Sequence, residues 1–254
     1  MIVALMLGRE GSVGFPGKNT FPVLSRPLMS YPLLAARFSK NVDLVYVSTD
    51  SEKIKRVALE YGATVIDRPP ELATKYSLGE DAYVHGYQYI KKSLSKSIEL
   101  IVLLFCNSAT IVARTIDEGI DILRKDLTLD SAVTVSCYNM WSPVRARKIN
   151  SEGLLQPFVP TEVFGDPQTL NCDRDSQGDV LFADMSVSIV RPHCLDNLDY
   201  GILPQRWMGQ RIYPLKQWGG CDVDYQWQVP GVEFWLREHG FSETQIPYQE
   251  SRKR

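Results

Sequence analysis

Short apolar runs rich in β-forming residues alternate along the chain with stretches whose apolar residues recur at helical spacing. The predicted strands are residues 2–7, 44–48, 63–66, 100–105, 131–137 and 184–190. The predicted helices are residues 28–39, 51–61, 79–94, 115–125 and 225–239. Such alternation is typical of an α/β fold, in which helices flank a mainly parallel sheet.

Residues 140–180 interrupt this alternation. The stretch is rich in proline, alternates with period two between residues 144 and 149, and has no clear helix. It predicts β-hairpins, or a β-rich arm that extends from the sheet, rather than a further crossover unit. Because no internal repeat or low-complexity linker is found, the 254 residues predict a single domain with this stretch as an inserted arm.

Composition and charge exclude several classes of protein. Hydrophobic residues make up 44% and charged residues 23% of the chain, which is ordinary for a soluble globular protein. The net charge of −2 argues against a nucleic-acid or membrane partner, and no apolar run reaches membrane-spanning length. Five cysteines without a C-x-x-C pair argue against a disulfide framework and, with three histidines, against a zinc site. We therefore expect a reduced, cytoplasmic protein.

The first predicted strand leads into a loop rich in glycine. Its glycines are Gly8, Gly11, Gly14 and Gly17, and the same loop carries Arg9, Lys18 and Asn19. Glycines allow backbone N–H groups to approach an anion closely. Two fixed positive charges suit a polyphosphate better than a single carboxylate. The loop is therefore a candidate polyphosphate site, and an incidental glycine-rich connection is the alternative.

Two familiar glycine loops do not fit this segment. A dinucleotide fingerprint requires G-x-G-x-x-G and a turn straight into a helix, but here the glycines are three apart and prolines delay the helix. This disfavours a dinucleotide-dependent dehydrogenase. The P-loop requires Ser or Thr after the lysine, and Lys18 is followed by Asn19.

A second candidate site is an Asp-x-Asp pair, Asp222 and Asp224, which follows two glycines and precedes the last predicted helix. On an extended backbone, two aspartates at i and i+2 can aim at one hard cation. The alternative is that they cap the following helix.

Both sites resemble those of one family. The run R-x-G-S-x-G-x-P-G-K-N, from Arg9 to Asn19, resembles the signature of cytidylyltransferases that activate sialic acids and related keto sugar acids. The Asp-x-Asp pair is similar to the Mg²⁺ site of that family. The resemblance covers nearly the whole chain. It implies a Rossmann-like nucleotidyltransferase fold, CTP as a substrate, Mg²⁺ as the cofactor, and a homodimer in which the arm completes the partner's sugar pocket.

The resemblance implies roles for individual residues. The implied nucleotide-binding residues are Leu7, Gly8, Arg9, Gly11, Ser12, Lys18, Asn19, Arg68 and Gly79. The implied catalytic residues are Arg9 and Lys18, which would neutralise phosphates, and the metal ligands Asp222 and Asp224.

Three further residues carry alternatives. Arg68 begins a run similar to the family's R-P-x-x-L-A and would lie beside the cytosine, or else be a solvated loop arginine. Glu10 stands where the family usually has glycine, so we expect its side chain to point away from the phosphates. Asp50 ends a V-S-T-D run like that of the family, and we expect it to cap the following helix.

The implied sugar-binding residues depart most from the family. They are Phe105, Asn107, Ser108, Arg174 and Asp184. Phe105 replaces a glutamine, and Asp184 replaces an asparagine. Because a buried carboxylate needs a partner, Asp184 would suit a sugar that carries an amine, and we expect an acceptor other than plain N-acetylneuraminic acid. Arg174 would pair with the sugar carboxylate across a dimer interface, or form a local salt-bridged turn.

The expected reaction transfers CMP from CTP to a keto sugar acid of the nonulosonic type and releases pyrophosphate. The alternatives are transfer of another nucleotide, or another acceptor such as an octulosonic acid, a sugar phosphate or a phosphonate. A non-catalytic nucleotide-binding homologue is a further alternative.

Overall fold

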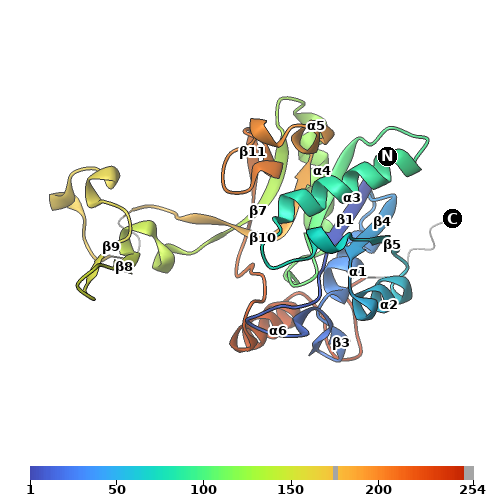
Figure 1. The fold of residues 1–254 in the computed structure, drawn as a ribbon, viewed down its shortest axis with the longest axis horizontal. Coiled ribbons are helices and arrows are strands. Elements are labelled where there is room, and N and C mark those ends of the chain that lie inside the picture. The colour runs from blue at the N-terminus through green and yellow to red at the C-terminus, as the bar shows by residue number, and fades with distance from the viewer. Residues whose placement is uncertain (174–176, 249–254) are drawn as a thin grey trace.

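The computed structural model describes residues 1–173 and 177–248. Within these residues the chain forms a seven-stranded sheet in the order β11-β7-β10-β6-β1-β4-β5 (Figure 1). The strands are β1 (Ile2–Leu7), β4 (Leu44–Thr49), β5 (Thr64–Asp67), β6 (Leu100–Phe105), β7 (Ser131–Cys137), β10 (Leu181–Val190) and β11 (Ile212–Gln217). Among these strands β10 runs antiparallel to its neighbours, and every other pairing is parallel.

The register of the central strands aligns their carboxyl ends. Leu7, the last residue of β1, pairs with Ser48 of β4 and with Phe105, the last residue of β6. Loops that follow these strands therefore leave the sheet at one edge. This is the edge at which parallel α/β sheets usually bind ligands.

Helices cover both faces of the sheet. They are α1 (Ser30–Phe38), α2 (Glu52–Glu60), α3 (Gly79–Ser93), α4 (Ala113–Lys125), α5 (Pro192–Asp196) and α6 (Val229–Glu238). Alternate residues of β1 belong to different hydrophobic clusters: Met6 packs with residues of α1, α2 and α4, whereas Leu5 packs with residues of α3 and α5. This is the two-residue period expected of a strand buried on both sides.

A third hydrophobic cluster connects the two ends of the chain. Phe15 of the glycine loop, Tyr31 of α1, Val223 of the Asp-x-Asp segment and Trp235 of α6 all belong to it. The short ribbon of β2 (Pro22–Val23) and β3 (Arg26–Pro27) contributes Val23. The cluster therefore fixes the glycine loop and the Asp-x-Asp pair relative to each other.

The elements expected from the sequence are largely present, with shifts of a few residues at their ends. The short ribbon of β2 and β3 was missed in the sequence, and so were one strand of the main sheet and one helix beside it. The strand β11 contains Pro214, which weakens a strand prediction but is tolerated because β11 lies at the edge of the sheet. The helix α5 has only five residues, too few to show a helical period. The last helix begins at Val229 rather than at 225, after a 3₁₀ turn at Gln226–Gln228.

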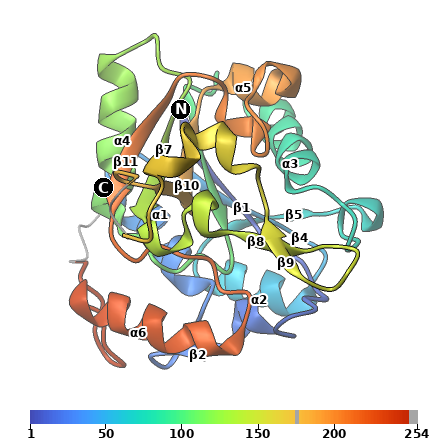
Figure 2. The same ribbon diagram turned by 90° about the vertical axis from the view of Figure 1, so that its left-hand side faces the viewer.

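Residues 138–173 and 177–180 leave the body between β7 and β10 and project from it as an arm (Figure 1). The described part of the arm contains a hairpin of β8 (Arg147–Ile149) and β9 (Leu155–Pro157), which faces the viewer in Figure 2. The remainder of the described arm is irregular chain with four short 3₁₀ turns. Large apolar side chains, including Trp141, Leu155 and Val163, are about 70% exposed. The predicted arm is thus present, and its part in dimerisation stays a prediction.

The cysteines divide between core and arm. Cys106 and Cys194 are buried and Cys221 is partly buried, whereas Cys137 at the end of β7 and Cys172 on the arm are exposed. In the described part of the chain, no helix has the length and apolar character needed to cross a membrane.

Candidate active site

A cavity of about 560 Å³ lies at the carboxyl ends of β1 and β6. Most of the residues expected to bind the nucleotide line it, and Gly11 is the exception. The lining includes Leu7, Gly8, Arg9, Ser12, Lys18, Asn19, Arg68, Gly79, Phe105, Asn107 and Asp224. Lys75 and Tyr225 also line it, although neither was singled out in the sequence.

Two glycines are needed where the loop passes close to other parts of the chain. A Cβ on Gly8 would collide with the Sγ atom of Cys106, and one on Gly14 would lie 2.8 Å from the carbonyl oxygen of Asp224. Gly17 has a φ of 76°, which favours glycine. The Nδ2 atom of Asn19 donates to the carbonyl oxygen of Arg9 at 3.3 Å and thereby closes the loop. The loop is therefore folded directly against the Asp-x-Asp segment.

The Asp-x-Asp pair lies opposite Lys18. The Lys18 ammonium, whose side chain is 12% exposed, is 2.5 Å from Oδ1 of Asp224. Burial, and then the negative charge of Asp224, raise the pKa of the Asp222 carboxyl. The Nδ2 atom of Asn107 donates to Oδ2 of Asp222 at 3.4 Å and to the Val223 carbonyl at 3.1 Å. Asn107 therefore connects the end of β6 to the acidic pair.

The helix-capping interpretation of the aspartates is wrong. The N-cap residue of α6 is Gln228, and that of the preceding 3₁₀ turn is Tyr225. The backbone N–H groups of Asp224 and Tyr225 both donate to Oε1 of Gln228, at 2.7 and 2.8 Å.

The acidic pair fits a hard divalent cation. Asp222 and Asp224 flank the buried Val223, and burial together with the negative charge of Asp224 raises the pKa of the Asp222 carboxyl. Carboxylate oxygens are the ligands that Mg²⁺ prefers.

Arg68 is not a solvated loop arginine. Its side chain is buried, and it donates from Nε to the Ser48 hydroxyl at 3.2 Å and from Nη2 to the Ser48 carbonyl at 2.5 Å. Burial lowers the pKa of its guanidinium. Because Arg68 also lines the cavity, its remaining N–H groups are available to a ligand there.

The comparisons with known proteins agree with this geometry. Residues 3–189 match the sequence profile of the Cytidylyltransferase family. The chain belongs to this family. CMP-N,N'-diacetyllegionaminic acid synthase of Legionella pneumophila is 32% identical over 166 residues, which cover 65% of this chain and 68% of that protein. N-acylneuraminate cytidylyltransferase of Escherichia coli is 36% identical over 94 residues, which are 37% of this chain and 21% of that protein.

The chain thus spans only about a fifth of the length of some of these relatives. Solved structures share the fold at low identity. CMP:2-keto-3-deoxy-manno-octonic acid synthetase complexed with CTP superposes with a TM-score of 0.65 at 15% identity, covering 93% of this chain and 98% of that one. This confirms the predicted nucleotidyltransferase fold for this chain.

Of the residues expected to bind the sugar, the structure brings two into the cavity. Phe105 and Asn107 line it, and Phe105 packs edge-on against Tyr83 with ring centroids 5.3 Å apart. Ser108 is fully buried, and its hydroxyl has no hydrogen-bond partner in the described part of the chain. Arg174 lies outside the described residues.

Asp184 does not line the cavity, contrary to expectation. Its Oδ2 atom accepts hydrogen bonds from the Ser136 hydroxyl at 2.7 Å and from Nε2 of Gln217 at 2.9 Å, and its Oδ1 atom accepts one from the Ser186 N–H at 3.1 Å. The partners that a buried carboxylate needs are thus supplied by the chain itself. A direct contact between Asp184 and a sugar amine is therefore not supported.

The expectations for Glu10 and for Asp50 have different outcomes. The Glu10 carboxylate accepts a hydrogen bond from the Ser51 hydroxyl and does not line the cavity, as expected of a side chain directed away from phosphates. Asp50, however, does not cap α2. Ser51 is the N-cap residue, and its hydroxyl accepts a hydrogen bond from the Ile54 N–H at 3.5 Å.

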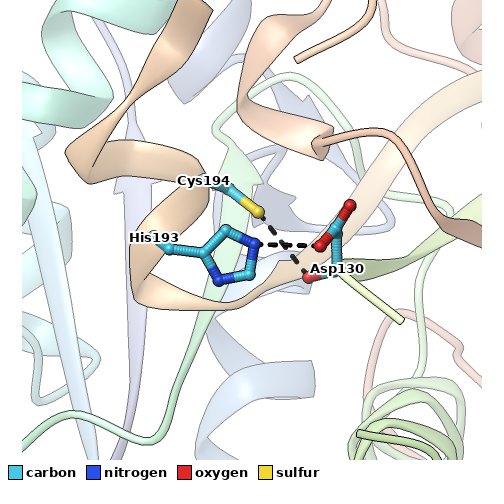
Figure 3. A group of neighbouring side chains, drawn as sticks. All are labelled: Asp130, His193 and Cys194. Carbon is cyan, nitrogen blue, oxygen red and sulfur yellow. Dashed lines mark hydrogen bonds and ion pairs between the residues drawn. The ribbon is translucent and has the colours of Figure 1, made fainter. Parts of the chain in front are cut away.

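A separate cluster of Asp130, His193 and Cys194 has potential metal ligands (Figure 3). Oδ1 of Asp130 lies 2.9 Å from Nε2 of His193, and the Cys194 thiol points to the Asp130 carbonyl oxygen at 3.7 Å. Burial raises the pKa of the Cys194 thiol to about 12. The contacts of the cluster have a structural role, because they hold α5 against Asp130, which directly precedes β7.

We expect Asp130→Asn to lower the free energy of unfolding by about 2–4 kcal/mol, because Asp130 is a buried acceptor for several groups. Its Oδ2 atom accepts hydrogen bonds from the N–H groups of Gln210 and Arg211 and from the Tyr200 hydroxyl. The melting temperature should fall by roughly 5–15 °C, measured by calorimetry.

The same substitution should change the dependence of stability on pH. Burial alone would raise the pKa of Asp130, but the N–H groups of Arg211 and Gln210, with His193 and Tyr200, lower it below its ordinary value. The stabilisation is then fully present above pH about 4 and is lost as the pH falls through the lowered pKa. A difference in stability between wild type and Asp130→Asn that grew towards acid pH would contradict this assignment.

Proposed function

We propose that this cytidylyltransferase transfers CMP from CTP to a keto sugar acid of the nonulosonic type and releases pyrophosphate. The observation that carries the proposal is the meeting of the glycine loop with Asp224 of the Asp-x-Asp pair at one cavity, where Lys18 contacts Asp224. Asp222 does not line this cavity and is joined to it through Asn107. The named relatives that make CMP-N,N'-diacetyllegionaminic acid and CMP-N-acylneuraminic acid support the class of acceptor.

The reaction requires positioning and charge neutralisation more than covalent chemistry. The anomeric hydroxyl oxygen of the sugar forms a bond to the α-phosphorus of CTP. The bond from that phosphorus to the bridging oxygen breaks, pyrophosphate leaves with the electron pair, and the hydroxyl proton passes to water. Arg9 and Lys18 would bind the phosphate oxygens, and buried Arg68 would bind the base.

Asp222 and Asp224 would hold Mg²⁺, which, when bound, supplies positive charge to the phosphates. Asn107 would keep Asp222 oriented through its hydrogen bond. In the structure, the Lys18 ammonium forms an ion pair with Asp224. This ion pair holds the glycine loop against the Asp-x-Asp segment in the absence of a ligand.

We further propose that the cytidylyltransferase is a cytoplasmic homodimer that uses no nucleic acid or membrane partner. The exposed apolar side chains of the arm support association, because a contiguous exposed apolar surface is typical of an interface.

The proposal is tested by measuring pyrophosphate release with Mg²⁺ and CTP against neuraminic, legionaminic, pseudaminic and octulosonic acids. UTP, GTP and ATP serve as controls. We expect release with CTP and a nonulosonic acid. Release only with an octulosonic acid, or only with another nucleotide, would replace the proposed acceptor or base. Binding of CTP without release for any acid would favour a non-catalytic homologue.

A further inference from the structure

We propose that Asp50 and Glu10 are positioning residues that hold the glycine loop in its phosphate-binding form by tying it to the start of α2. This rests on the proposed function only in assigning the loop to phosphates. Neither residue touches the cavity, so each acts through the loop rather than on a substrate.

Two contacts make the connection. The backbone N–H of Glu10 donates to Oδ1 of Asp50 at 3.0 Å. The carboxylate of the same Glu10 accepts a hydrogen bond from the hydroxyl of Ser51, the N-cap residue of α2. Two residues before Glu10, the Gly8 N–H donates to the Ser48 carbonyl at 3.2 Å. The first part of the loop is thus attached to the end of β4 and the start of α2.

The rest of residues 9–14 has few other contacts: Nδ2 of Asn19 donates to the Arg9 carbonyl, and Gly14 lies against the Asp224 carbonyl. Residues 9–14 contain no buried residue, and Phe15 is the next side chain in a hydrophobic cluster. The Arg9 guanidinium folds back on the Glu10 and Gly11 carbonyls at 3.5 and 3.4 Å, and both distances are at the limit for a hydrogen bond. A segment rich in glycine loses much conformational entropy when it is fixed. The attachment at Glu10 therefore supplies order that the loop itself cannot.

The charges of the two anchoring residues are compatible with a phosphate site. The Glu10 carboxylate lies at the N-terminal end of a nine-residue helix, where the helix dipole favours a negative charge. The Asp50 carboxylate acts electrostatically on Arg68, where it partly opposes the lowering of the guanidinium pKa by burial.

The test compares Asp50→Ala, which removes the acceptor, with Asp50→Asn, which keeps an oxygen acceptor for the Glu10 N–H. Asp199→Ala is the matched control, because Asp199 is exposed and pairs with Arg206 far from the loop in the sequence. Three quantities are measured: CTP affinity by calorimetry, amide hydrogen exchange of residues 8–14 in the ligand-free protein, and the melting temperature.

We expect Asp50→Ala to weaken CTP binding about tenfold and to speed exchange of the loop amides, with an unchanged melting temperature. Asp50→Asn and the control should stay within about twofold of wild type. Glu10→Ala should speed loop exchange in the same way, and Glu10→Gln, which keeps an acceptor for Ser51, should restore most of the protection.

Loop exchange and CTP affinity that are unchanged in Asp50→Ala would overturn the inference. Equal damage from Asp50→Asn and Asp50→Ala would also overturn it, because the hydrogen bond would then not be the cause. Hydrogen exchange needs neither CTP nor turnover. A wild-type protein that bound no CTP would therefore contradict the proposed function, and the exchange data would still decide the role of Asp50.

Discussion

Asp222→Asn and Asp224→Asn are each expected to lower the turnover of CMP transfer on the order of a hundredfold or more. Asparagine preserves the size of each side chain and removes only its charge. The change therefore removes one charged ligand of the proposed cation and leaves the packing of Val223 intact.

The reason lies in the environment of the pair. Burial and the neighbouring Asp224 already oppose ionisation of Asp222, so a cation is the partner that makes two carboxylates favourable there. Loss of either carboxylate weakens binding of the proposed cation, and the triphosphate then lacks part of its counter-charge as pyrophosphate departs.

The measurement is steady-state turnover at saturating CTP and acceptor, accompanied by Mn²⁺ binding followed by electron paramagnetic resonance. Asp130→Asn is the matched control, because it removes a carboxylate from the structural cluster and should alter stability but not the turnover of the folded protein. Near-normal turnover in either Asp222→Asn or Asp224→Asn would show that the metal assignment is wrong.

Lys18→Met is expected to change the affinities for two ligands in opposite directions. Affinity for CTP should fall on the order of a hundredfold, because a buried positive charge beside the phosphates is lost. Affinity of the ligand-free protein for Mn²⁺ should rise severalfold, because the ammonium 2.5 Å from Asp224 no longer competes with the cation.

Lys53→Met is the control, since Lys53 is an exposed lysine of α2. Calorimetry measures the CTP affinity, and paramagnetic resonance measures Mn²⁺ in the absence of nucleotide. A general loss of folding would lower the affinities for both CTP and Mn²⁺. A lower affinity for CTP together with a higher affinity for Mn²⁺ therefore indicates that the cation has replaced Lys18 as the partner of Asp224. Equal losses of affinity for CTP and Mn²⁺ would refute the competition between Lys18 and the cation for Asp224.

The parts of the site that lie close together in the sequence were predictable. The glycine loop contains its own charges and follows a strand whose apolar run is unbroken, and all of these features are local. Asp222 and Asp224 are likewise close together in the sequence, and their role as metal ligands stays a prediction.

The parts that depend on neighbouring strands were not predictable from local pattern. Asp50 was expected to cap α2, because an Asp before a helix usually does so. Its actual partner, the Glu10 N–H, is 40 residues away and is brought close by the parallel pairing of β1 with β4.

Asp184 was misplaced for a similar reason. The pairing of β10 with β7 shifts register between Ala183 and Ser188, and Met185 adopts a φ of 62° there. This irregularity directs the Asp184 carboxylate towards Ser136 and Gln217. A bulge of this kind has no reliable signature in the residues themselves.

The distribution of the cysteines provides the arm with a natural reporter. Cys106 and Cys194 have no exposed surface, and burial raises the pKa of each thiol to about 12, so both resist a thiol-directed dye at neutral pH. Cys137 and Cys172 are exposed, one at the root of the arm and one along it. A maleimide fluorophore will therefore mark the arm of the wild-type protein, and its polarisation can follow the assembly of two copies without engineered labelling sites.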